Sequence, residues 1–323
     1  MTTTAWVIGG RGLLGRATSA HIVHRLGWKL LAASPMPWSD SEALLGAVRS
    51  TTRDLLAGSS GNNSTWAIIW AAGAAITSSS QKQLDSELAQ LELILATIRS
   101  ELPLSARRGS IFYASSAGGV YGGSANPPFS ELTAPVPISP YGEFKLRAET
   151  LVQSFAARES LSCLVGRIAN LYGPGQKLEK VQGIISHVAK AQMSPTPASI
   201  YVSLDTIRDY IFVKDCAELI CDALDRLDSV TEKDSPVGVT KILASGEGTT
   251  IATLLGYFRT LSKGHPHVML GSSASANLQA HDLRLRSVVW PELDYRDLTP
   301  LPAGIYATIL DILSGIQAGP GAR

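Results

Sequence analysis

The chain has 323 residues, of which 45% are hydrophobic and 17% are charged. This length and composition allow a substantial core in one large or two closely joined domains and exclude a disordered protein. The formal net charge of +1 provides no broad positive field, so we expect no nucleic-acid partner.

Apolar runs and helical stretches alternate through the first half of the chain. The apolar runs predict buried parallel strands at 5–8, 29–33, 66–70, 110–114 and 161–168, with 210–213 as the last of the set. A helix is predicted over 13–26, directly after the first strand. Because strands separated by helices form right-handed βαβ units, we predict an α/β fold with a doubly wound parallel sheet.

Three glycines spaced three apart follow the first strand, at Gly9, Gly12 and Gly15. In such a loop the first glycine permits a tight turn, the second a close approach to a pyrophosphate, and the third close packing of helix on strand. The helix that begins at Leu13 and Leu14 offers free N–H groups to the phosphates. The loop therefore predicts a Rossmann-type site for a dinucleotide.

The end of the second strand bears on the choice of cofactor. A carboxylate that would hold the ribose of NAD is absent there, since 31–34 reads Leu-Ala-Ala-Ser and the next acidic residue is Asp40. Arg11 inside the glycine loop could pair with a 2′-phosphate, and Ser34 could add a hydrogen bond. We therefore favour NADP(H), with NAD(H) as the alternative.

Residues 34–65 contain two prolines and a run of small polar residues, which predict an irregular excursion. Residues 171–203 are again rich in proline and glycine and begin a less regular part. We expect a dinucleotide-binding domain over 1–170, with 204–244 returning to it, and a smaller mixed α/β domain over 171–323 that binds the substrate.

Residues 81–102 predict a long helix with one apolar seam. The seam residues recur in steps of four and three: Leu84, Leu88, Leu91, Leu95, Ile98 and Leu102. The seam is expected to cover the sheet. Leu93 and Ile94 lie off the seam, and this second apolar face is expected to meet a partner subunit in a homodimer.

Tyr141 and Lys145 follow Ser139-Pro140, which is a natural helix start. Residues four apart share one helix face. A phenol has a pKa of about 10 and is a poor catalyst at neutral pH. A neighbouring ammonium favours the phenolate, so the pair can exchange a proton with a substrate oxygen while hydride moves to or from a nicotinamide.

A serine pair, Ser115-Ser116, leaves the strand predicted at 110–114. This strand end lies at the carboxyl edge of the sheet, where ligands bind in open α/β folds. A hydroxyl there could donate a hydrogen bond to the reacting oxygen. We choose Ser116 for this role and Ser115 as the second candidate.

The pattern resembles the extended short-chain dehydrogenase/reductase family, also called the NAD-dependent epimerase/dehydratase family. The matching pieces run in family order along nearly the whole chain: Gly9/Gly12/Gly15, 70–73, 115–116 with 120–122, 139–141 with Lys145, 167–176, 208–215 and 245–247.

The resemblance implies a catalytic triad of Ser116, Tyr141 and Lys145. It implies that Lys145 also contacts the nicotinamide ribose. It further implies that cofactor contacts come from Ala71, Ala72, Gly73 and Ile168. Members of the family act mostly on nucleotide-activated sugars, and by analogy Asn170 and Arg208 would meet the diphosphate of such a substrate. An internal Arg208–Asp209 salt bridge is the alternative for that arginine. Many members dimerise through two helices per subunit.

The chain also departs from parts of the family pattern. The Asp-Glu pair of sugar 4,6-dehydratases is replaced by Ala117 and Gly118, which argues against dehydration. The cysteine and histidine used in 3,5-epimerisation are missing beside Ser116, and His187 is expected to be structural. The segment before Arg208 lacks the glycines that many members have there.

The leading hypothesis is a nucleotide-sugar 4-ketoreductase or 4-epimerase with Tyr141 as the acid or base. A reductase of a non-sugar carbonyl is the second hypothesis. A non-enzymatic dinucleotide sensor is the third, and the presence of both Tyr141 and Lys145 argues against it.

The remaining sequence features concern location and metals. The three cysteines, an odd number without a Cys-x-x-Cys pair, are expected to be reduced and buried. Met1–Thr4 runs directly into an apolar strand, and the run from Trp66 to Ile76 is too short to span a bilayer. We therefore expect a cytoplasmic protein with no membrane contact, and we predict no metal site.

Overall fold

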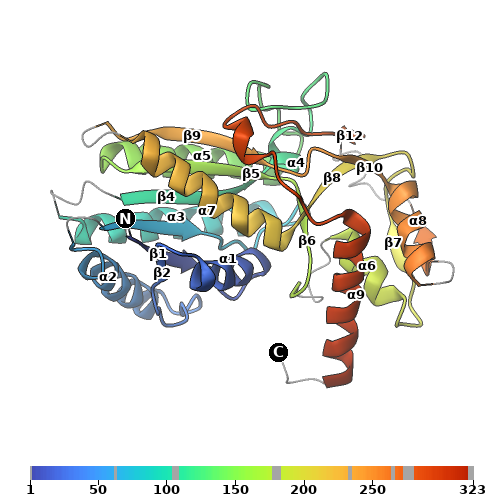
Figure 1. Cartoon of the computed structure of the whole chain (residues 1–323), viewed down its shortest axis with the longest axis horizontal. Helices are drawn as coiled ribbons and strands as arrows, with labels where there is room; N and C mark the ends of the chain where they lie inside the picture. The colour runs from blue at the N-terminus through green and yellow to red at the C-terminus, as the bar shows by residue number, and fades with distance from the viewer. Residues whose placement is uncertain are drawn as a thin grey trace.

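The computed structural model of the chain describes residues 2–61, 64–103, 109–176, 183–231, 235–262, 266–271 and 280–318. A large sheet with helices on both faces lies beside a smaller α/β part (Figure 1). The predicted fold class, a Rossmann-type doubly wound sheet with a smaller mixed α/β part, is confirmed.

The large sheet has six strands, all paired in parallel. Their order across the sheet is β2 (Trp28–Leu30), β1 (Thr2–Ile8), β3 (Ser64–Trp70), β4 (Gly109–Ser116), β5 (Ser162–Ile168) and β9 (Gly238–Leu243). The chain builds outward from β1 in both directions, so the strand order switches between β1 and β3. In open α/β sheets the crevice at such a switch point is where ligands bind.

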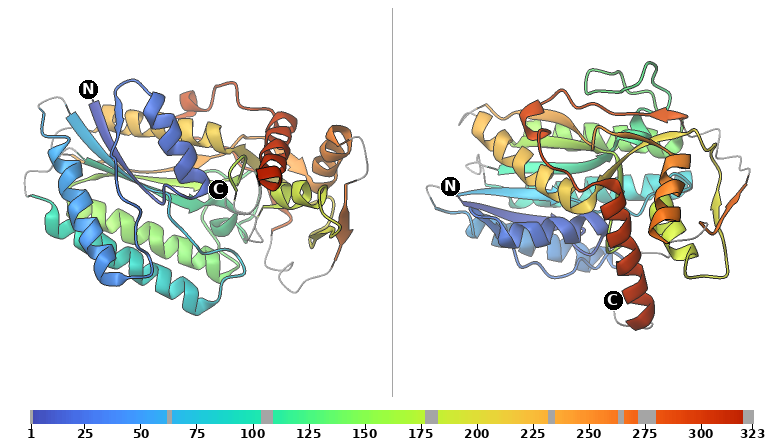
Figure 2. Two further views of the ribbon diagram at one scale, coloured as in Figure 1. Left: turned by 90° about the horizontal axis from the view of Figure 1, so that it is seen from below. Right: turned by 45° about the vertical axis from the view of Figure 1, so that its right-hand side comes forward.

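Helices cover both faces of this sheet (Figure 2). One face carries α1 (Leu13–His24) and α7 (Val213–Val230). The other carries α2 (Ser41–Ala57), α3 (Gln81–Glu101) and α5 (Pro140–Arg158). The strands are buried on both sides, which is why they read as continuous apolar runs. The predicted strands and the helices at 13–26 and 81–102 are confirmed, although β2 is shorter than expected.

The prediction of an irregular excursion over 34–65 is wrong for its central part. Residues 41–57 form α2, which begins where the Asp40 side chain accepts a hydrogen bond from the Ala43 N–H. Its apolar face is narrow, with Leu44, Val48 and Leu55 buried at helical spacing. Two small polar residues, Thr51 and Thr52, are buried as well, and they interrupt the apolar period of the helix.

The prediction that 210–213 is the last strand of the large sheet is also wrong. Strand β8 (Ile207–Phe212) belongs to a second sheet, where it pairs with β6 (Asn170–Tyr172), β10 (Gly248–Thr250) and β12 (Asp282–Leu283). The sixth place in the large sheet belongs to β9. That strand carries the fully buried Lys241, whose ammonium donates to Asp294, Ser287 and the Val289 carbonyl. A lysine at this place made the strand unrecognisable as an apolar run.

The smaller part packs three helices around its own core. These are α6 (Ile184–Ala191), α8 (Ile251–Leu261) and α9 (Leu301–Ala318), beside the strand pair β7 (Ala198–Ile200) and β11 (Val268–Leu270). Helix α7 leads from β8 back to the large sheet. The division of the chain into domains at residue 170 stays a prediction.

One contact joins the phosphate-loop helix to the smaller part. The Arg16 guanidinium on α1 donates to the Gly175 carbonyl, and the Gly175 N–H donates to the Asp311 carboxylate on α9 at 2.8 Å. Gly175 has a φ of +94°, and a β-carbon there would meet the arginine. A glycine is therefore required at this junction.

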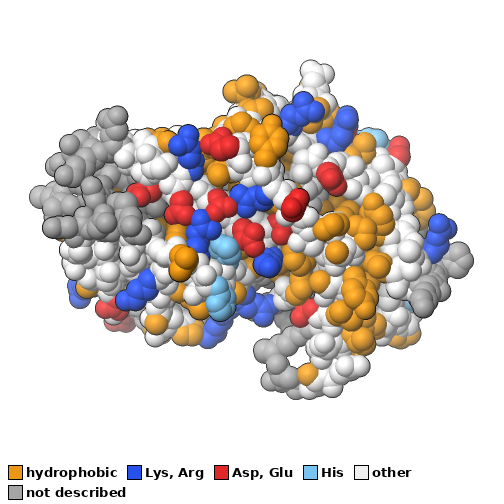
Figure 3. All heavy atoms as spheres, viewed as in Figure 1, with side chains coloured by type: hydrophobic (Ala, Val, Ile, Leu, Met, Phe, Trp, Pro, Cys, Tyr) orange, Lys and Arg blue, Asp and Glu red, His pale blue; other side chains and the backbone are white. Residues whose placement is uncertain are grey.

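Helix α9 is largely exposed, and hydrophobic side chains gather along it in Figure 3. Its exposed apolar residues are Tyr306, Leu310, Leu313 and Ile316. Within the described ranges it is the helix long and apolar enough to cross a membrane by length and composition, and 22% of it is buried.

The seam of α3 covers the sheet as expected. Leu91, Leu95 and Ile98 are buried in the core of that face. The predicted second apolar face is wrong, because Ile94 is fully buried in the same core while Leu93 alone is 44% exposed. The three cysteines are free and buried, as predicted.

Candidate active site

Two glycines at the turn after β1, Gly9 and Gly15, leave no space for a side chain. Gly9 has a φ of +90°, and a β-carbon on it would lie 2.5 Å from the Ala72 nitrogen. A β-carbon on Gly15 would lie 2.2 Å from the Gly9 carbonyl oxygen. Helix α1 begins after Gly12, where no side chain caps its free N–H groups. These features fit the pyrophosphate of a dinucleotide, which needs close backbone approach and uncapped donors.

A cavity of about 410 Å³ opens beside this turn. Six of the predicted cofactor residues line it: Gly9, Arg11, Gly12, Ala71, Ala72 and Gly73. Its other lining residues were not foreseen and come from five segments: Trp38, Trp70, Ala74, Glu87, Gln90, Leu91, Tyr113 and Phe144. The cavity therefore runs from the glycine turn to the end of β4 and the first turn of α5.

Seven predicted cofactor residues do not line this cavity. Leu14 and Ile168 are buried in the core under α1 and α7. Leu13 is the first residue of α1 and is partly buried, and Ser34 is exposed in the loop after β2. The other three are Gly15, Tyr141 and Lys145. Contacts from these seven residues to a cofactor stay a prediction.

Glu87 on α3 fixes the turn that follows β3. Its carboxylate accepts hydrogen bonds from the Ala74 and Ala75 N–H groups at 3.0 and 2.8 Å. A β-carbon on Gly73 would lie 3.4 Å from the same carboxylate. The carboxylate thus holds the wall of the cavity in place. Sequence reasoning missed it, because Glu87 lies on the helix and not in the motif that it supports.

Helix α5 presents Tyr141 and Lys145 as predicted. It begins at Pro140, and the Ser139 hydroxyl accepts the Gly142 N–H at 3.2 Å. Tyr141 and Lys145 are 9% and 7% exposed, and the Lys145 ammonium is 5.7 Å from the centre of the Tyr141 ring. The two side chains therefore lie together, one helical turn apart.

The surroundings of Lys145 raise the pKa of its ammonium above the usual value. Burial, the largest single influence, lowers that pKa, but the oxygens of Tyr113, Tyr141 and Glu87 together outweigh it. The lysine therefore stays charged at neutral pH, which is the state that favours a phenolate at Tyr141.

The two serine candidates point to different partners. The Ser115 hydroxyl donates to the buried Glu149 carboxylate at 2.5 Å. The Ser116 hydroxyl accepts the Gly119 N–H at 3.2 Å, which caps α4 (Ala117–Val120). The O–H of Ser116 is still available to donate, whereas that of Ser115 is used within the fold. The geometry favours Ser116.

A buried ion pair supports the end of β4. Arg167 on β5 donates to the Glu149 carboxylate at 2.8 Å and to the Tyr121 hydroxyl at 2.7 Å. Glu149 lies one turn after Lys145 on α5, so the pair joins α5 to the sheet beneath the catalytic candidates. Removing one partner of such a pair leaves a buried charge and is strongly destabilising. Glu149 lies outside every motif recognised in the sequence.

The predicted substrate residues Asn170 and Arg208 lie on neighbouring strands. The Asn170 amide donates to the Asp209 carbonyl at 2.8 Å. Arg208 is 7% exposed and donates to the carbonyls of Ile207 and His281 at 2.8 and 3.3 Å. Among the described residues no carboxylate pairs with it.

The alternative of an Arg208–Asp209 salt bridge is wrong. The Asp209 carboxylate instead accepts hydrogen bonds from the Ser245 and Gly246 N–H groups, both at 2.8 Å, and from the Ser245 hydroxyl. Neighbouring residues of a strand point to opposite faces, so the two side chains cannot meet.

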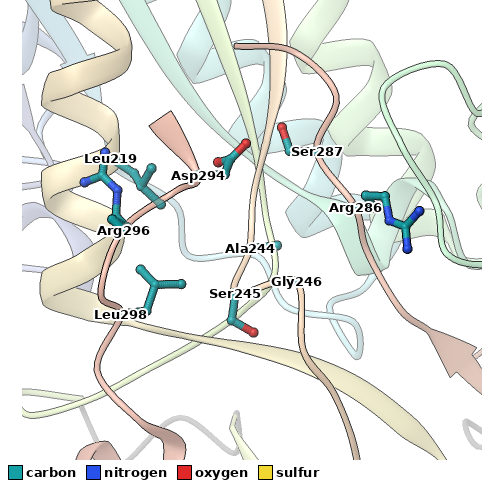
Figure 4. Close-up of a pocket in the computed structure, with 9 residues that line it drawn as sticks. All are labelled: Leu219, Ala244, Ser245, Gly246, Arg286, Ser287, Asp294, Arg296 and Leu298. Carbon is teal, nitrogen blue, oxygen red and sulfur yellow. The ribbon is translucent and has the colours of Figure 1, made fainter. Parts of the chain in front are cut away.

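A second, smaller pocket of about 130 Å³ lies near the end of β9 (Figure 4). Two of its charged groups are already paired, since Asp294 binds Lys241 and Arg296 binds Asp222. The Arg286 side chain points away from Ser245 and Gly246 in Figure 4. No group of three or more His, Cys, Asp or Glu side chains could hold a metal ion within the part of the chain that the structure describes.

Comparisons with known proteins identify the family and the fold. A segment of 108 residues is 36% identical to dTDP-4-dehydro-6-deoxyglucose reductase of Escherichia coli and covers 33% of this chain and 34% of that protein. The chain thus spans about a third of the length of this curated relative.

Two solved structures share the fold over almost the whole chain. RMD from Pseudomonas aeruginosa complexed with NADPH has a TM-score of 0.75 at 22% identity, covering 97% of this chain and 98% of that one. UDP-glucose 4-epimerase of Thermus thermophilus, in complex with NAD, has a TM-score of 0.75 at 19% identity, covering 99% and 100%. The sequence pattern of the NAD dependent epimerase/dehydratase family matches residues 5–238, which is well over half of the chain. The chain therefore belongs to the NAD dependent epimerase/dehydratase family.

Proposed function

We propose that the chain is an NAD(P)-dependent enzyme that transfers hydride at C4 of a nucleotide-activated sugar, as a 4-ketoreductase or a 4-epimerase. The observation that carries the proposal is that Lys145, which lies beside Tyr141, also lies against Tyr113 and Phe144, two residues that line the cavity at the glycine turn. When bound, the dinucleotide supplies or accepts the hydride. Tyr141 gives a proton to the C4 oxygen when a ketone is reduced and removes it when an alcohol is oxidised.

Lys145 and Ser116 support this proton transfer. The charged ammonium stabilises the phenolate of Tyr141, and the Ser116 hydroxyl donates a hydrogen bond to the reacting oxygen. Ser116 lies on the same side as Tyr141 because α4, which Ser116 caps, packs against that ring: a β-carbon on Gly119 would lie 3.1 Å from the Tyr141 Cε1 atom.

The environment of Arg208 supports the proposal that the substrate carries a diphosphate. Burial lowers the pKa of its guanidinium, and the nearby Tyr210 and Asp282 only partly oppose this. A buried cation without an ion-pair partner costs free energy, and a phosphate oxygen offsets that cost. Asn170 lies on the neighbouring strand, with its amide directed at the backbone of β8.

NADP(H) is favoured over NAD(H) for two reasons. Arg11 is exposed and lines the cavity, where its guanidinium could pair with a 2′-phosphate. Asp40, the first acidic residue after β2, uses its carboxylate to cap α2. Titration of NADPH and NADH against the wild type and Arg11→Ala tests the preference. Tighter NADPH binding that Arg11→Ala abolishes supports it, and equal affinities contradict it.

One assay distinguishes the 4-ketoreductase reaction from the 4-epimerase reaction. A 4-ketoreductase oxidises one NADPH for each 4-keto sugar nucleotide reduced. A 4-epimerase interconverts two sugar nucleotides without net consumption of the dinucleotide. The absence of a carboxylate after β2 favours the reductase. If UDP-, dTDP- and GDP-linked sugars all fail while a simple ketone is reduced, the enzyme acts on a non-sugar carbonyl.

Assembly and location complete the proposal. A homodimer through α3 stays proposed, although Leu93 is the one large apolar residue that is exposed on this fully described helix. Light scattering of the wild type and Leu93→Glu tests it: the proposal requires a dimer that the substitution weakens.

A cytoplasmic location is proposed as well, and fractionation of cells expressing the tagged chain tests it.

A further inference from the structure

The Lys145 ammonium is enclosed by three aromatic rings. Its nitrogen lies 5.3 Å from the centre of the Tyr113 ring, 5.6 Å from that of Phe144 and 5.7 Å from that of Tyr141. A cation within about 6 Å of an aromatic face is attracted by the ring quadrupole, and more strongly where water is excluded. The rings of Tyr113, Phe144 and Tyr141 form an aromatic cage around the ammonium.

One hydrogen bond of this ammonium is made within the protein, from an N–H group to the Ala114 carbonyl at 3.2 Å. The oxygen of Tyr113 also acts on the ammonium and helps to raise its pKa. Both oxygens belong to β4, so the strand holds the amine from one side. Other N–H groups of the ammonium are left for the Tyr141 phenol or for a bound ribose.

The cage also replaces a carboxylate partner. Lys145 is 7% exposed, and within the described residues no Asp or Glu forms an ion pair with it. The Glu87 carboxylate acts on it only at longer range and is already bonded to two backbone N–H groups. A buried ammonium without an ion pair would otherwise be costly, and the ring faces with the Tyr113 oxygen offset that cost.

We propose that Tyr113 and Phe144 are positioning residues that hold the Lys145 ammonium in the cage, so that one of its N–H groups faces the phenol oxygen of Tyr141. The inference rests on the proposed function and deepens it. It also assigns a role to Phe144, whose side chain both lines the cofactor cavity and faces the ammonium.

Lysine NMR of the cofactor-free protein tests the cage directly. The protein is labelled with ¹³C,¹⁵N-lysine, and the Lys145 signal is assigned by its loss in Lys145→Arg. Ring currents should shift the Lys145 ε-methylene protons upfield in the wild type. Phe144→Leu should remove much of that shift, whereas Phe144→Tyr, which keeps a ring, should retain it.

Phe155→Leu is the matched control. Phe155 is a buried residue of the same helix that packs in the sheet-facing core. The same substitution there should lower stability to a similar degree without moving the Lys145 signal. An unshifted Lys145 signal in the wild type, or one that Phe144→Leu leaves in place, overturns the proposal whatever the enzyme's substrate proves to be.

Tyr113→Phe provides a second variant that changes one oxygen atom. The ring remains, so the upfield shift should persist, but exchange of the Lys145 ammonium protons with water should accelerate because the stabilising oxygen of Tyr113 is lost. In the active enzyme at saturating cofactor, Phe144→Leu should lower kcat at neutral pH by about tenfold and move the basic midpoint of the pH profile upward. An unchanged pH midpoint in Phe144→Leu contradicts the positioning role, while absence of turnover in the wild type would instead count against the proposed function.

Discussion

The carbonyl oxygen of Gly119 lies only 2.1 Å from the place where a β-carbon on Gly142 would stand. Helices α4 and α5 therefore meet backbone to backbone. Ser116 caps α4 and Tyr141 precedes Gly142, so this contact sets the spacing between the proposed hydrogen-bond donor and the proposed acid. Two glycines far apart in the sequence thus position the reacting groups.

Gly142→Ala should push these two helices apart. We expect a loss of about 1–3 kcal/mol in the free energy of unfolding, because the added methyl overlaps backbone that cannot swing away. We also expect a fall in kcat with little change in cofactor affinity. Urea unfolding and steady-state kinetics measure both effects. Gly46→Ala is the control: nothing lies within 4 Å of its β-carbon in α2, so it should be neutral or slightly stabilising. Full activity in Gly142→Ala would contradict this account of the spacing.

The glycine turn offers a matched pair of substitutions within one loop. Gly15→Ala places a methyl 2.2 Å from the Gly9 carbonyl oxygen, whereas a β-carbon on Gly10 meets its nearest atom at 3.6 Å. Gly15→Ala should therefore abolish measurable binding of NADPH in a fluorescence titration, and Gly10→Ala should retain it. Equal affinities in the two variants would show that close backbone approach is not what this loop provides.

The features that could be predicted from the sequence are those that depend on interactions between residues close together in the chain. The glycine turn, the Tyr141–Lys145 spacing and the buried strands could be predicted, because each depends on residues close together in the chain. Glu87, Tyr113 and Phe144 could not, since their roles come from contacts between separate elements. Strand β9 was missed because the partners that make Lys241 tolerable in a core, such as Asp294, lie about fifty residues further on.

Asp209 should give stability a measurable pH dependence. Burial raises the pKa of its carboxyl to about 6, although hydrogen bonds from Ser245 and Gly246 lower it in part. The folded-state pKa lies above the unfolded value, so this residue's contribution is fully present below pH 4 and is lost as pH rises through 6. The size of that contribution is about 3 kcal/mol.

Asp209→Asn isolates that contribution. Urea unfolding of the wild type and Asp209→Asn at pH 4 and pH 7.5 should show the stability advantage of the wild type shrinking as pH rises. The other titrating groups are common to both proteins and cancel in the difference. A difference that stays constant, or that grows toward pH 7.5, would mean that the carboxyl is not held neutral by burial.

Binding of a nucleoside diphosphate should depend on the Arg208 guanidinium. A nucleoside diphosphate of the preferred base, at 100 times its Kd, should raise the Tm of the wild type by about 5 °C. Arg208→Met should lose most of this shift, and Arg259→Met, an exposed arginine at the end of α8, should keep it. If Arg208→Met retains the shift, the diphosphate binds elsewhere.

The central claim is that Tyr141 exchanges the proton while hydride moves at the cavity beside the glycine turn. The most direct measurement is single-turnover hydride transfer by Tyr141→Phe, with the dissociation constant of NADPH determined on the same protein. We predict a rate lower by about 10²–10⁴ and an unchanged dissociation constant, because only the acid–base group is removed. A wild-type rate in Tyr141→Phe would contradict the claim.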